Sequence, residues 1–419
     1  MWRALYTASL VLALPWILAR LWWRGAREPG YREHVAERFG RFPHDAAAGV
    51  IWIHAVSVGE ARAAEPLVRA LQRAHPGERV LLTCLTAAGR QTIAERYGES
   101  VMTAYLPYDF PGACGRFLAH FQPRLGVLME TEIWPNLLAA CRAAGVPVVL
   151  ANARLSEESA RGYARFAALS RPAFASLAAV CAQSELAAAR LRALGAPGVQ
   201  LCGNMKFDAE ADAAKLAEGR EMKSALGNRR VLLLASTREG EEAMLLDAFA
   251  ASAAAPDVLL AIVPRHPQRF DEVANLAATR GFVVARRSEG GAIAREARVL
   301  VGDSMGEMLA YYEAADVVIM GGSLLPFGSQ NLIEACALGK PVIVGPHTYN
   351  FGEASKSAIA AGAALRVADA EQALKAAAAL AADPARREAM GRSALAFVAA
   401  HRGAVARLVD WIEATTAAR

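Results

Sequence analysis

The sequence predicts an α/β protein with two parallel-sheet domains, preceded by an apolar amino-terminal segment. Three observations lead to this prediction. The chain has 419 residues, which is enough for two or three domains of ordinary size. Its hydrophobic share of 54% suffices for large cores and argues against disorder. Short apolar runs alternate with helix-like segments in both halves, which is typical of parallel sheets covered on both faces.

The first segment, residues 1–25, is predicted to be a membrane anchor. Residues 4–19 carry no charge, and extending the run to Trp23 approaches the ~20 residues that span a bilayer but includes Arg20. Only Arg3 precedes the run, whereas four arginines follow its core: Arg20, Arg24, Arg27 and Arg32. The positive-inside rule therefore keeps the body in the cytoplasm. The segment could span a membrane or lie in its interface. A cleaved signal peptide is the alternative, although no small-residue cleavage site is evident.

The first domain is predicted to occupy residues 26–210. Its charged start, residues 31–43, is expected at the membrane surface. Helices are expected at 61–74 and 136–144. Apolar runs predict strands near 50–54, 80–85, 125–129, 146–151, 178–181 and 199–202.

Residues 211–228 are polar and rich in alanine, without a strand, and are predicted to be a linker. The second domain is predicted to occupy 229–419. Alanine-rich helices fill 370–409, and the last helix could pack back on the first domain. Strands are expected near 231–235, 258–263, 282–284, 299–301, 317–320 and 341–344.

Composition narrows the possible partners. The net charge of +5 fits an anionic membrane surface or anionic substrates. No Lys/Arg-rich run is interleaved with aromatic residues, so nucleic acid is not expected. The six cysteines are scattered without a C-x-x-C pair, which predicts reduced core residues and neither a disulfide frame nor a zinc site.

Acidic residues follow two strands of the first domain. Glu60, in HAVSVGE, lies at a strand-to-helix turn, where it could act as a general base or cap the helix. Glu130 and Glu132 follow another strand, and residues two apart in an extended segment point to the same side. They could form a site, or one could cap the next helix while the other binds backbone amides. A metal would need further ligands, which are absent at suitable spacing.

Basic and backbone groups follow three further strands. Lys206, in GNMKFD, could meet an anionic substrate group or pair with Asp208 or another acid. Arg265 lies between prolines after a strand, which suits recognition of a phosphate or a base. The turn at 305–307 exposes backbone groups, unless it is a simple loop with Asp303 as a helix cap.

The stretch from 317 to 346 predicts a strand, a glycine-rich turn, a helix and a second strand. The helix is expected to begin near Asn331 and to end before Gly339. In an open α/β sheet, ligands bind outside the carboxyl ends of the strands. Glu334, on the first turn of this helix, could therefore accept hydrogen bonds from a ribose, or could only complement the helix dipole.

Several motifs occur together in a specific order: HAVSVGE, METEIWPN, NARLSE, GNMKFD, PRHP, GDSMGE and NLIEA…GKPVIVGPHTYNF. In this order they resemble the 3-deoxy-D-manno-octulosonic acid (Kdo) transferases, from YREHVAERFGRFP to GPHTYNF. The resemblance implies an inverting glycosyltransferase of the GT-B fold, with two Rossmann-like domains facing a cleft. Such enzymes transfer Kdo from CMP-Kdo to a lipid A precursor, lipid IVA, in lipopolysaccharide biosynthesis. They act at the cytoplasmic face of the inner membrane, without a metal or other cofactor.

The resemblance also implies roles for individual residues. Glu60 would be the general base, with Glu130 and Lys206 assisting at the transition state. The CMP moiety would be held by Pro264, Arg265, Met305, Gly306, Glu307, Asn331, Leu332, Ile333 and Glu334.

Two positions depart from the pattern. Arg238 and Gln330 stand where the family often has histidine, and Gln330 can donate a hydrogen bond but cannot titrate near neutral pH. Two other functions stay open: a GT-B transferase that uses a UDP-sugar, and a non-catalytic membrane-associated protein that binds nucleotide sugars.

Overall fold

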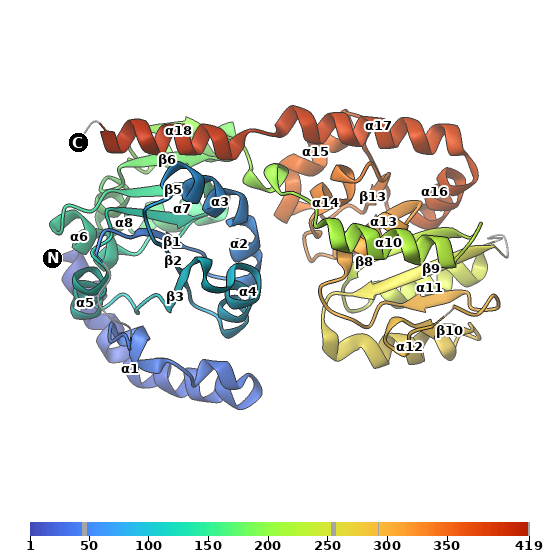
Figure 1. Cartoon of the computed structure of the whole chain (residues 1–419), viewed down its shortest axis with the longest axis horizontal. Helices are drawn as coiled ribbons and strands as arrows, with labels where there is room; N and C mark the ends of the chain where they lie inside the picture. Colours follow the sequence, from blue (N-terminus) through green and yellow to red (C-terminus); the bar gives the residue numbers. More distant parts are fainter. Residues whose placement is uncertain (44–47, 253–256, 292, 418–419) are drawn as a thin grey trace. The chain divides into compact units, whose positions relative to one another are not determined.

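The computed structural model describes residues 1–43, 48–252, 257–291 and 293–417. The chain divides into two compact units (Figure 1). The first unit comprises Met1–Ala209 and Arg402–Arg419, and the second comprises Glu210–His401. Each unit contains its own parallel sheet, which confirms the fold class predicted from the sequence.

The sheet of the first unit has seven parallel strands in the order β3-β2-β1-β4-β5-β6-β7. Its strands are β1 (Ile51–His54), β2 (Val80–Cys84), β3 (Met102–Tyr105), β4 (Leu125–Met129), β5 (Val148–Ala153), β6 (Ala179–Ala182) and β7 (Val199–Leu201). The apolar runs predict all of them except β3. That strand lies at the edge of the sheet and is only half buried at its start, so it lacks a long apolar run.

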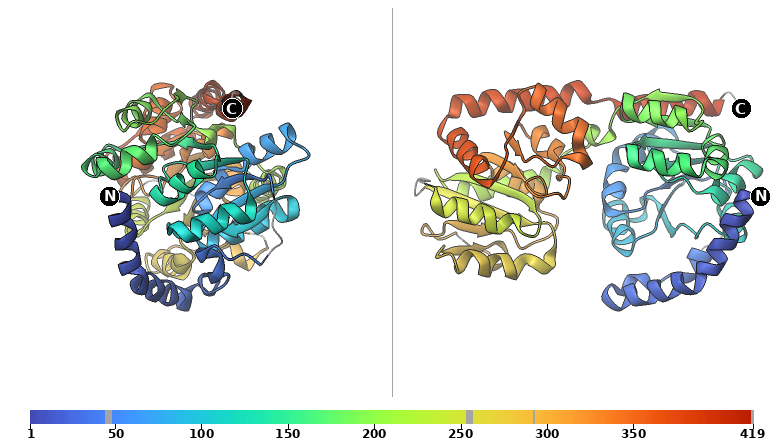
Figure 2. Two further views of the ribbon diagram at one scale, coloured as in Figure 1. Left: turned by 90° about the vertical axis from the view of Figure 1, so that its left-hand side faces the viewer. Right: turned by 180° about the vertical axis from the view of Figure 1, so that it is seen from behind.

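Helices cover both faces of this sheet (Figure 2). The helix predicted at 61–74 is divided in two, because Pro66 at the start of the second part has no N–H to continue the first. The helices are α1 (Trp2–Arg27), α2 (Val58–Ala63), α3 (Glu65–Ala74), α4 (Ala87–Tyr97), α5 (Pro111–Phe121), α6 (Pro135–Ala143), α7 (Glu157–Arg165), α8 (Ala167–Phe174), α9 (Glu185–Ala193) and α18 (Ala404–Ala417), with 3₁₀ turns η1 (Pro29–Tyr31), η2 (Val35–Phe39), η3 (Gly98–Ser100) and η4 (Met205–Asp208).

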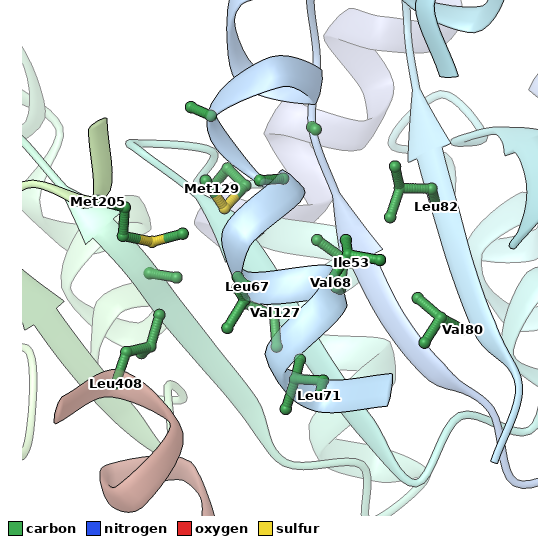
Figure 3. Close-up of a cluster of buried hydrophobic side chains, with 14 of the residues drawn as sticks. Ile53, Leu67, Val68, Leu71, Val80, Leu82, Val127, Met129, Met205 and Leu408 are labelled. Carbon is green, nitrogen blue, oxygen red and sulfur yellow. The ribbon is translucent and has the colours of Figure 1, made fainter. Parts of the chain in front are cut away.

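The carboxyl-terminal helix α18 completes a core of the first unit. Figure 3 shows Leu408 of α18 beside Met205, in the cluster that includes Leu67 of α3 and Met129 of β4. All four side chains are buried. The chain therefore returns to its first unit after the second unit is complete.

The second unit also has a seven-stranded parallel sheet, in the order β10-β11-β9-β8-β12-β13-β14. The strands are β8 (Arg230–Thr237), β9 (Val258–Pro264), β10 (Val284–Arg286), β11 (Val299–Val301), β12 (Val317–Met320), β13 (Val342–Val344) and β14 (Ala364–Arg366). The sequence does not predict β14, a short edge strand that is buried only at its first residue.

The segment 211–228 is not a separate linker, which corrects the prediction. It contains helix α10 (Ala213–Ala225), which packs against helix α13 (Met308–Ala314) of the second unit. Gly219 allows this close packing, because a Cβ atom there would lie 2.6 Å from the carbonyl oxygen of Ala310. The helices of this unit are α10 (Ala213–Ala225), α11 (Glu241–Ala251), α12 (Phe270–Ala278), α13 (Met308–Ala314), α14 (Leu332–Ala337), α15 (Gly352–Ala360), α16 (Ala370–Ala382) and α17 (Pro384–His401), with η5 (Pro267–Arg269), η6 (Arg287–Glu289) and η7 (Tyr349–Phe351).

The charged segment 31–43 was expected at the membrane surface, and for Glu37 and Arg38 this is wrong. Glu37 and Arg38 are 1% and 2% exposed. Arg38 lies 3.8 Å from the ring centre of Tyr105 and donates to the carbonyl of Leu85 at 3.0 Å. Glu37 pairs with Arg90 at 2.7 Å. Glu37 is therefore buried as part of an ion pair, and this part of the segment belongs to the folded body.

The prediction that all six cysteines are reduced is also wrong. The structure joins Cys181 of β6 to Cys202, which follows β7. These strands are parallel neighbours, with Cys181 opposite Gln200. The remaining four cysteines are free and buried. Spacing in the sequence does not reveal which strands are neighbours, so the pair could not be predicted.

Candidate active site

The predicted base, Glu60, lies in the first turn of α2, directly after β1. Its carboxylate accepts a hydrogen bond from the backbone N–H of Val56 at 2.9 Å and a longer one from the Ser57 hydroxyl at 3.4 Å. The side chain therefore does stabilise the helix start, as the alternative interpretation requires. The same contacts fix the carboxylate at the carboxyl edge of the first sheet.

Glu130 follows β4 and is 8% exposed. Its backbone has φ of 58°, so the expected extended geometry that would point Glu130 and Glu132 to one side is wrong. Glu130 instead forms one ion pair with Arg154 at 2.6 Å and another with Lys206 at 3.4 Å. Glu132 accepts a hydrogen bond from the indole N–H of Trp134 at 2.7 Å.

Two asparagines fix the position of Lys206. The Asn204 side chain accepts from the backbone N–H of Lys206 at 3.0 Å, and the Asn152 side chain accepts from that of Met205 at 3.1 Å. Asp208 is not the partner of Lys206, because it binds the backbone N–H groups of Gly403 and Val405 at the start of α18. Lys206 is thereby directed to Glu130.

Two carboxyl groups of this cluster, Glu60 and Glu132, have pKa values above the usual one. Burial and, next, the charge of Glu130 raise the pKa of Glu60 to about 7; the charge of Glu132 acts in the same direction, and the hydrogen bond from Val56 and the charge of Arg154 oppose the shift. Burial also raises the pKa of Glu132. A carboxylate that exchanges its proton near neutral pH is suited to general-base catalysis.

His54 does not compete with Glu60 as a base. It ends β1 and is completely buried, and burial lowers its pKa to about 3. Its Nδ1 lies 3.1 Å from the carbonyl oxygen of Thr83 and 2.9 Å from the hydroxyl of the same residue. His54 is a structural residue beneath the carboxylate cluster.

Sequence reasoning missed Arg154 and Asn152. Both stand in the motif NARLSE, at the end of β5 and beside β4 in the sheet. Asn152 has φ of 52° and lies where the register between β5 and β6 shifts. Polar residues after an apolar strand are the signal that could have identified them.

The second unit carries unpaired positive charge at the carboxyl edge of its sheet. Arg265 follows Pro264, the last residue of β9, and Arg238 follows β8. Within the described part of the chain, neither arginine forms an ion pair. Burial first, and then the charges of Arg238, Arg265 and Arg269, lower the pKa of His266. The Arg238 guanidinium lies 4.6 Å from the ring centre of Phe327. Guanidinium groups without an acidic partner at strand ends suit an anionic ligand.

The turn after β12 is held by Glu241, whose side chain is completely buried. This carboxylate accepts from the backbone N–H groups of Gly322 at 2.6 Å, Arg238 at 2.9 Å and Leu324 at 3.0 Å. A Cβ atom at Gly322 would lie 3.3 Å from the amide nitrogen of Gln330 and 3.5 Å from Cγ of Arg238. The two positions that depart from the family pattern are therefore neighbours.

Asn331 caps α14, as expected from the sequence. Its oxygen accepts from the N–H of Ile333 at 3.1 Å, and its amide donates to Glu334 at 2.9 Å. Leu332 and Ile333 are buried, so only their backbone could contact a ligand. Burial raises the pKa of the Tyr312 hydroxyl, and the charge of Glu334 acts in the same direction, whereas that of Arg265 acts against it.

The turn at 305–307 combines exposed and fixed groups. Met305 is 59% exposed and Gly306 has φ of 82°, a conformation that favours glycine. The Glu307 carboxylate is paired with Arg287 at 3.0 Å, so its side chain already has a partner. Asp303 does not cap α13: it accepts from the backbone N–H of Ser288 at 2.8 Å.

No group of three or more His, Cys, Asp or Glu side chains among the described residues is arranged to hold a metal ion. A partly buried carboxylate at the sheet edge of one α/β unit and arginines at the sheet edge of the other are the groups that a glycosyltransferase would use as a base and as ligands of an anionic donor.

Comparison with known proteins identifies the family to which the chain belongs. Residues 33–209 match the family described as 3-deoxy-D-manno-octulosonic-acid transferase, and residues 283–396 match glycosyl transferases group 1. The chain is 49% identical to the 3-deoxy-D-manno-octulosonic acid transferase of Bordetella pertussis over 428 residues, which covers 99% of both chains. It is 36% identical to that of Haemophilus influenzae, covering 90% of this chain and 89% of the relative. The chain belongs to the 3-deoxy-D-manno-octulosonic acid transferase family and transfers Kdo.

Solved structures support the fold alone. A glycosyltransferase from Rickettsia africae superposes with a TM-score of 0.60 at 12% identity, covering 88% of this chain and 98% of that one. A UDP-GlcNAc 2-epimerase from Neisseria meningitidis gives 0.60 at 17% identity, covering 86% and 98%. The GT-B-like architecture expected from the sequence is thus confirmed. The glycosyltransferase class is confirmed by the family and the relatives described above.

Proposed function

We propose that the chain transfers Kdo from CMP-Kdo to a lipid A precursor, lipid IVA, in lipopolysaccharide biosynthesis. The observation that carries the catalytic part is the Glu60 carboxylate, whose pKa is raised to about 7 beside the ion-paired Glu130. The donor proposal draws on the unpaired Arg238 and Arg265 of the second unit and on the family to which the chain belongs.

In the proposed reaction, Glu60 takes the proton from an acceptor hydroxyl while that oxygen attacks the anomeric carbon of Kdo. The bond from this carbon to the phosphate oxygen breaks, and the electron pair leaves with CMP. Attack from the opposite face inverts the anomeric centre. Lys206 and Glu130 position the reacting groups through their ion pair. Arg265 compensates the charge that develops on the phosphate, so the mechanism needs no metal.

The CMP moiety is proposed to bind at the carboxyl edge of the second sheet. Its ligands there are those that the family resemblance implies: Pro264 and Arg265, Met305 to Glu307, and Asn331 to Glu334. Asn331 donates to the Glu334 carboxylate at 2.9 Å, and a ribose hydroxyl is proposed to donate to the same carboxylate. We add Arg238 as a phosphate ligand, because it lies beside Gly322, stacks on the ring of Phe327 and makes no ion pair among the described residues.

The acceptor is a lipid, so the enzyme is proposed to work at the cytoplasmic face of the inner membrane. Support comes from α1, which by length and composition could associate with a bilayer. The arginines that follow its apolar part are compatible with an anionic surface.

The deciding experiment uses the purified full chain in detergent with CMP-Kdo and lipid IVA. We expect a lipid product whose mass increases by one or more Kdo units, with transfer persisting in excess chelator. Binding of CMP should exceed binding of UDP. Preference for UDP-sugars would favour the alternative GT-B transferase, and donor binding without any product would favour a non-catalytic binder.

A further inference from the structure

We infer that α1 lies in the headgroup region of one membrane leaflet, with both of its ends on the side that carries the first unit. This inference rests on the proposed membrane association and specifies its geometry. The alternative is a helix that crosses the bilayer. The two arrangements differ in where the amino-terminal end of α1 lies.

The amino-terminal end of α1 is bound to the folded body. The hydroxyl of Thr7 lies 2.9 Å from the amide nitrogen of Asn136, and the Tyr6 hydroxyl is hydrogen bonded to Asp109. Asn136 and Asp109 are each only 3% exposed. Asp109 also accepts from the backbone N–H of Asn136 and of Leu137 at the start of α6. The docking point is therefore the beginning of a core helix.

The carboxyl-terminal end of α1 is bound to the same unit. Arg24 donates to the hydroxyl of Tyr31 at 2.6 Å, and Tyr31 is 4% exposed. The carbonyl of Gly30 accepts from Tyr105 at the end of β3, at 3.2 Å. Between its two ends, α1 contains Pro15, and Figures 1 and 2 show the helix bending along its course beside the first unit.

These two attachments conflict with a membrane-spanning helix. The helix has 26 residues, so at a rise of ~1.5 Å per residue it extends for about 39 Å. The hydrocarbon core of a bilayer is about 30 Å thick. An upright α1 would place Tyr6 and Arg24 near opposite surfaces, but the unit that binds both lies on one side only. Crossing would require Tyr6 and Thr7 to leave their buried partners.

The outer surface of α1 has the composition of an interfacial helix. Its exposed large side chains include Leu12 at 82% and four tryptophans, Trp2, Trp16, Trp22 and Trp23, at 52 to 63%. Three arginines lie on three of these rings, at 4.6 to 5.5 Å from the ring centres: Arg20 on Trp16, Arg27 on Trp23 and Arg32 on Trp22. Tryptophan and arginine together favour the headgroup region, and the positive charge selects anionic lipid. The partner of this surface is therefore an anionic leaflet.

The test asks which side of the membrane each end occupies. One variant has a cysteine inserted between Met1 and Trp2, and a second has Glu99→Cys, an exposed position on η3 of the first unit. The unaltered chain is the background control, since its four free cysteines are buried and the other two are paired. Both variants are expressed in a Gram-negative host and labelled with a membrane-impermeant maleimide, in intact spheroplasts and in inverted inner-membrane vesicles.

We expect both cysteines to be labelled in the same preparation, the inverted vesicles. Labelling of the amino-terminal cysteine in spheroplasts, with Glu99→Cys labelled only in inverted vesicles, would overturn the inference and leave the membrane association intact. Absence of the protein from the membrane fraction would overturn both. The inserted cysteine precedes α1 and alters no buried contact, so folding is not at risk.

Discussion

At the scale of single residues, Glu60 has two roles that one substitution can separate. Its carboxylate accepts a hydrogen bond from Val56 at the start of α2, and it is the proposed base. Glutamine retains the size and an acceptor oxygen but cannot take a proton. We therefore expect Glu60→Gln to lower kcat by about 10²–10⁴-fold, the usual contribution of general-base catalysis, with CMP affinity nearly unchanged.

The measurement pairs initial rates at saturating CMP-Kdo and lipid acceptor with a melting curve. If Glu60 only capped the helix, the substitution would lower the melting temperature somewhat and would hardly change the rate. Retention of more than about a tenth of wild-type turnover would therefore refute the base assignment. Glu130 would then be the next carboxylate to test.

The raised pKa of Glu60 also predicts a pH dependence. Only the carboxylate can accept a proton, and its pKa is about 7 instead of the usual 4.5. We expect kcat/KM to rise with pH and to level off above about 7, and the residual activity of Glu60→Gln to lack this rise. The effect on stability has the opposite sign: the folded state holds a proton that the unfolded state releases, so the contribution of Glu60 falls between pH 4.5 and 7. A rate independent of pH from 5 to 8 would contradict the assignment.

Substitution of Arg265 tests whether CMP binds at the carboxyl edge of the second sheet. Arg265 is exposed and, among the described residues, makes no ion pair, so truncation should leave the fold intact. Loss of a charged hydrogen bond to phosphate costs about 1.5–3 kcal/mol, so Arg265→Ala should weaken CMP binding roughly 10- to 150-fold by calorimetry. Arg280→Ala is the matched control, since Arg280 pairs with Asp247 at the surface. Equal CMP affinity in the two variants would remove Arg265 from the donor site.

At the scale of elements, the start of α11 shapes the turn after β12. Glu241 binds three backbone N–H groups of this region while completely buried. Glutamine would replace one acceptor oxygen by an NH₂ group, which cannot accept a hydrogen bond, so at least one backbone N–H would lose its acceptor. Since an unsatisfied buried donor costs about 1–3 kcal/mol, Glu241→Gln should lower stability by that order and also weaken CMP binding. Glu239→Gln, at an exposed position of the same loop, is the control and should be neutral. Similar unfolding midpoints for the two variants would show that the hydrogen bonds to the Glu241 carboxylate do not stabilise the fold.

At the scale of the whole molecule, removal of residues 1–23 tests the role of α1. The truncated protein should lose most of its binding to vesicles that contain anionic lipid, because the exposed tryptophans and Arg20 are removed. The body should still fold, since Tyr31 and the sheet remain. We also expect a small loss of stability, on the order of 1 kcal/mol, because Asn136 and Asp109 lose their bonds to Thr7 and Tyr6.

Flotation of both proteins with vesicles of phosphatidylethanolamine, with and without phosphatidylglycerol, measures the first effect, and chemical unfolding measures the second. Undiminished flotation of the truncated protein would locate the membrane contact on the body instead of α1.

The sequence by itself determined the class of fold and the positions where chemistry could occur. Alternating apolar and helical segments predict parallel sheets, because a strand buried on both faces has no polar side. Strand ends then identify Glu60, Glu130, Lys206 and Arg265, since ligands bind at the carboxyl edge of such sheets. The motifs also identified the family, which the 49% identity to a known member confirms.

The tertiary structure alone decided which of these residues meet. Glu130 and Lys206 are 76 residues apart, and their ion pair depends on the order of strands and on the positive φ of Glu130. The same holds for the pairing of Cys181 with Cys202 and for the return of α18 to the first unit. Local patterns report burial and periodicity, but contacts between distant segments arise only when whole elements pack. That packing also fixed both ends of α1 on one unit, a relation that no apolar run can encode.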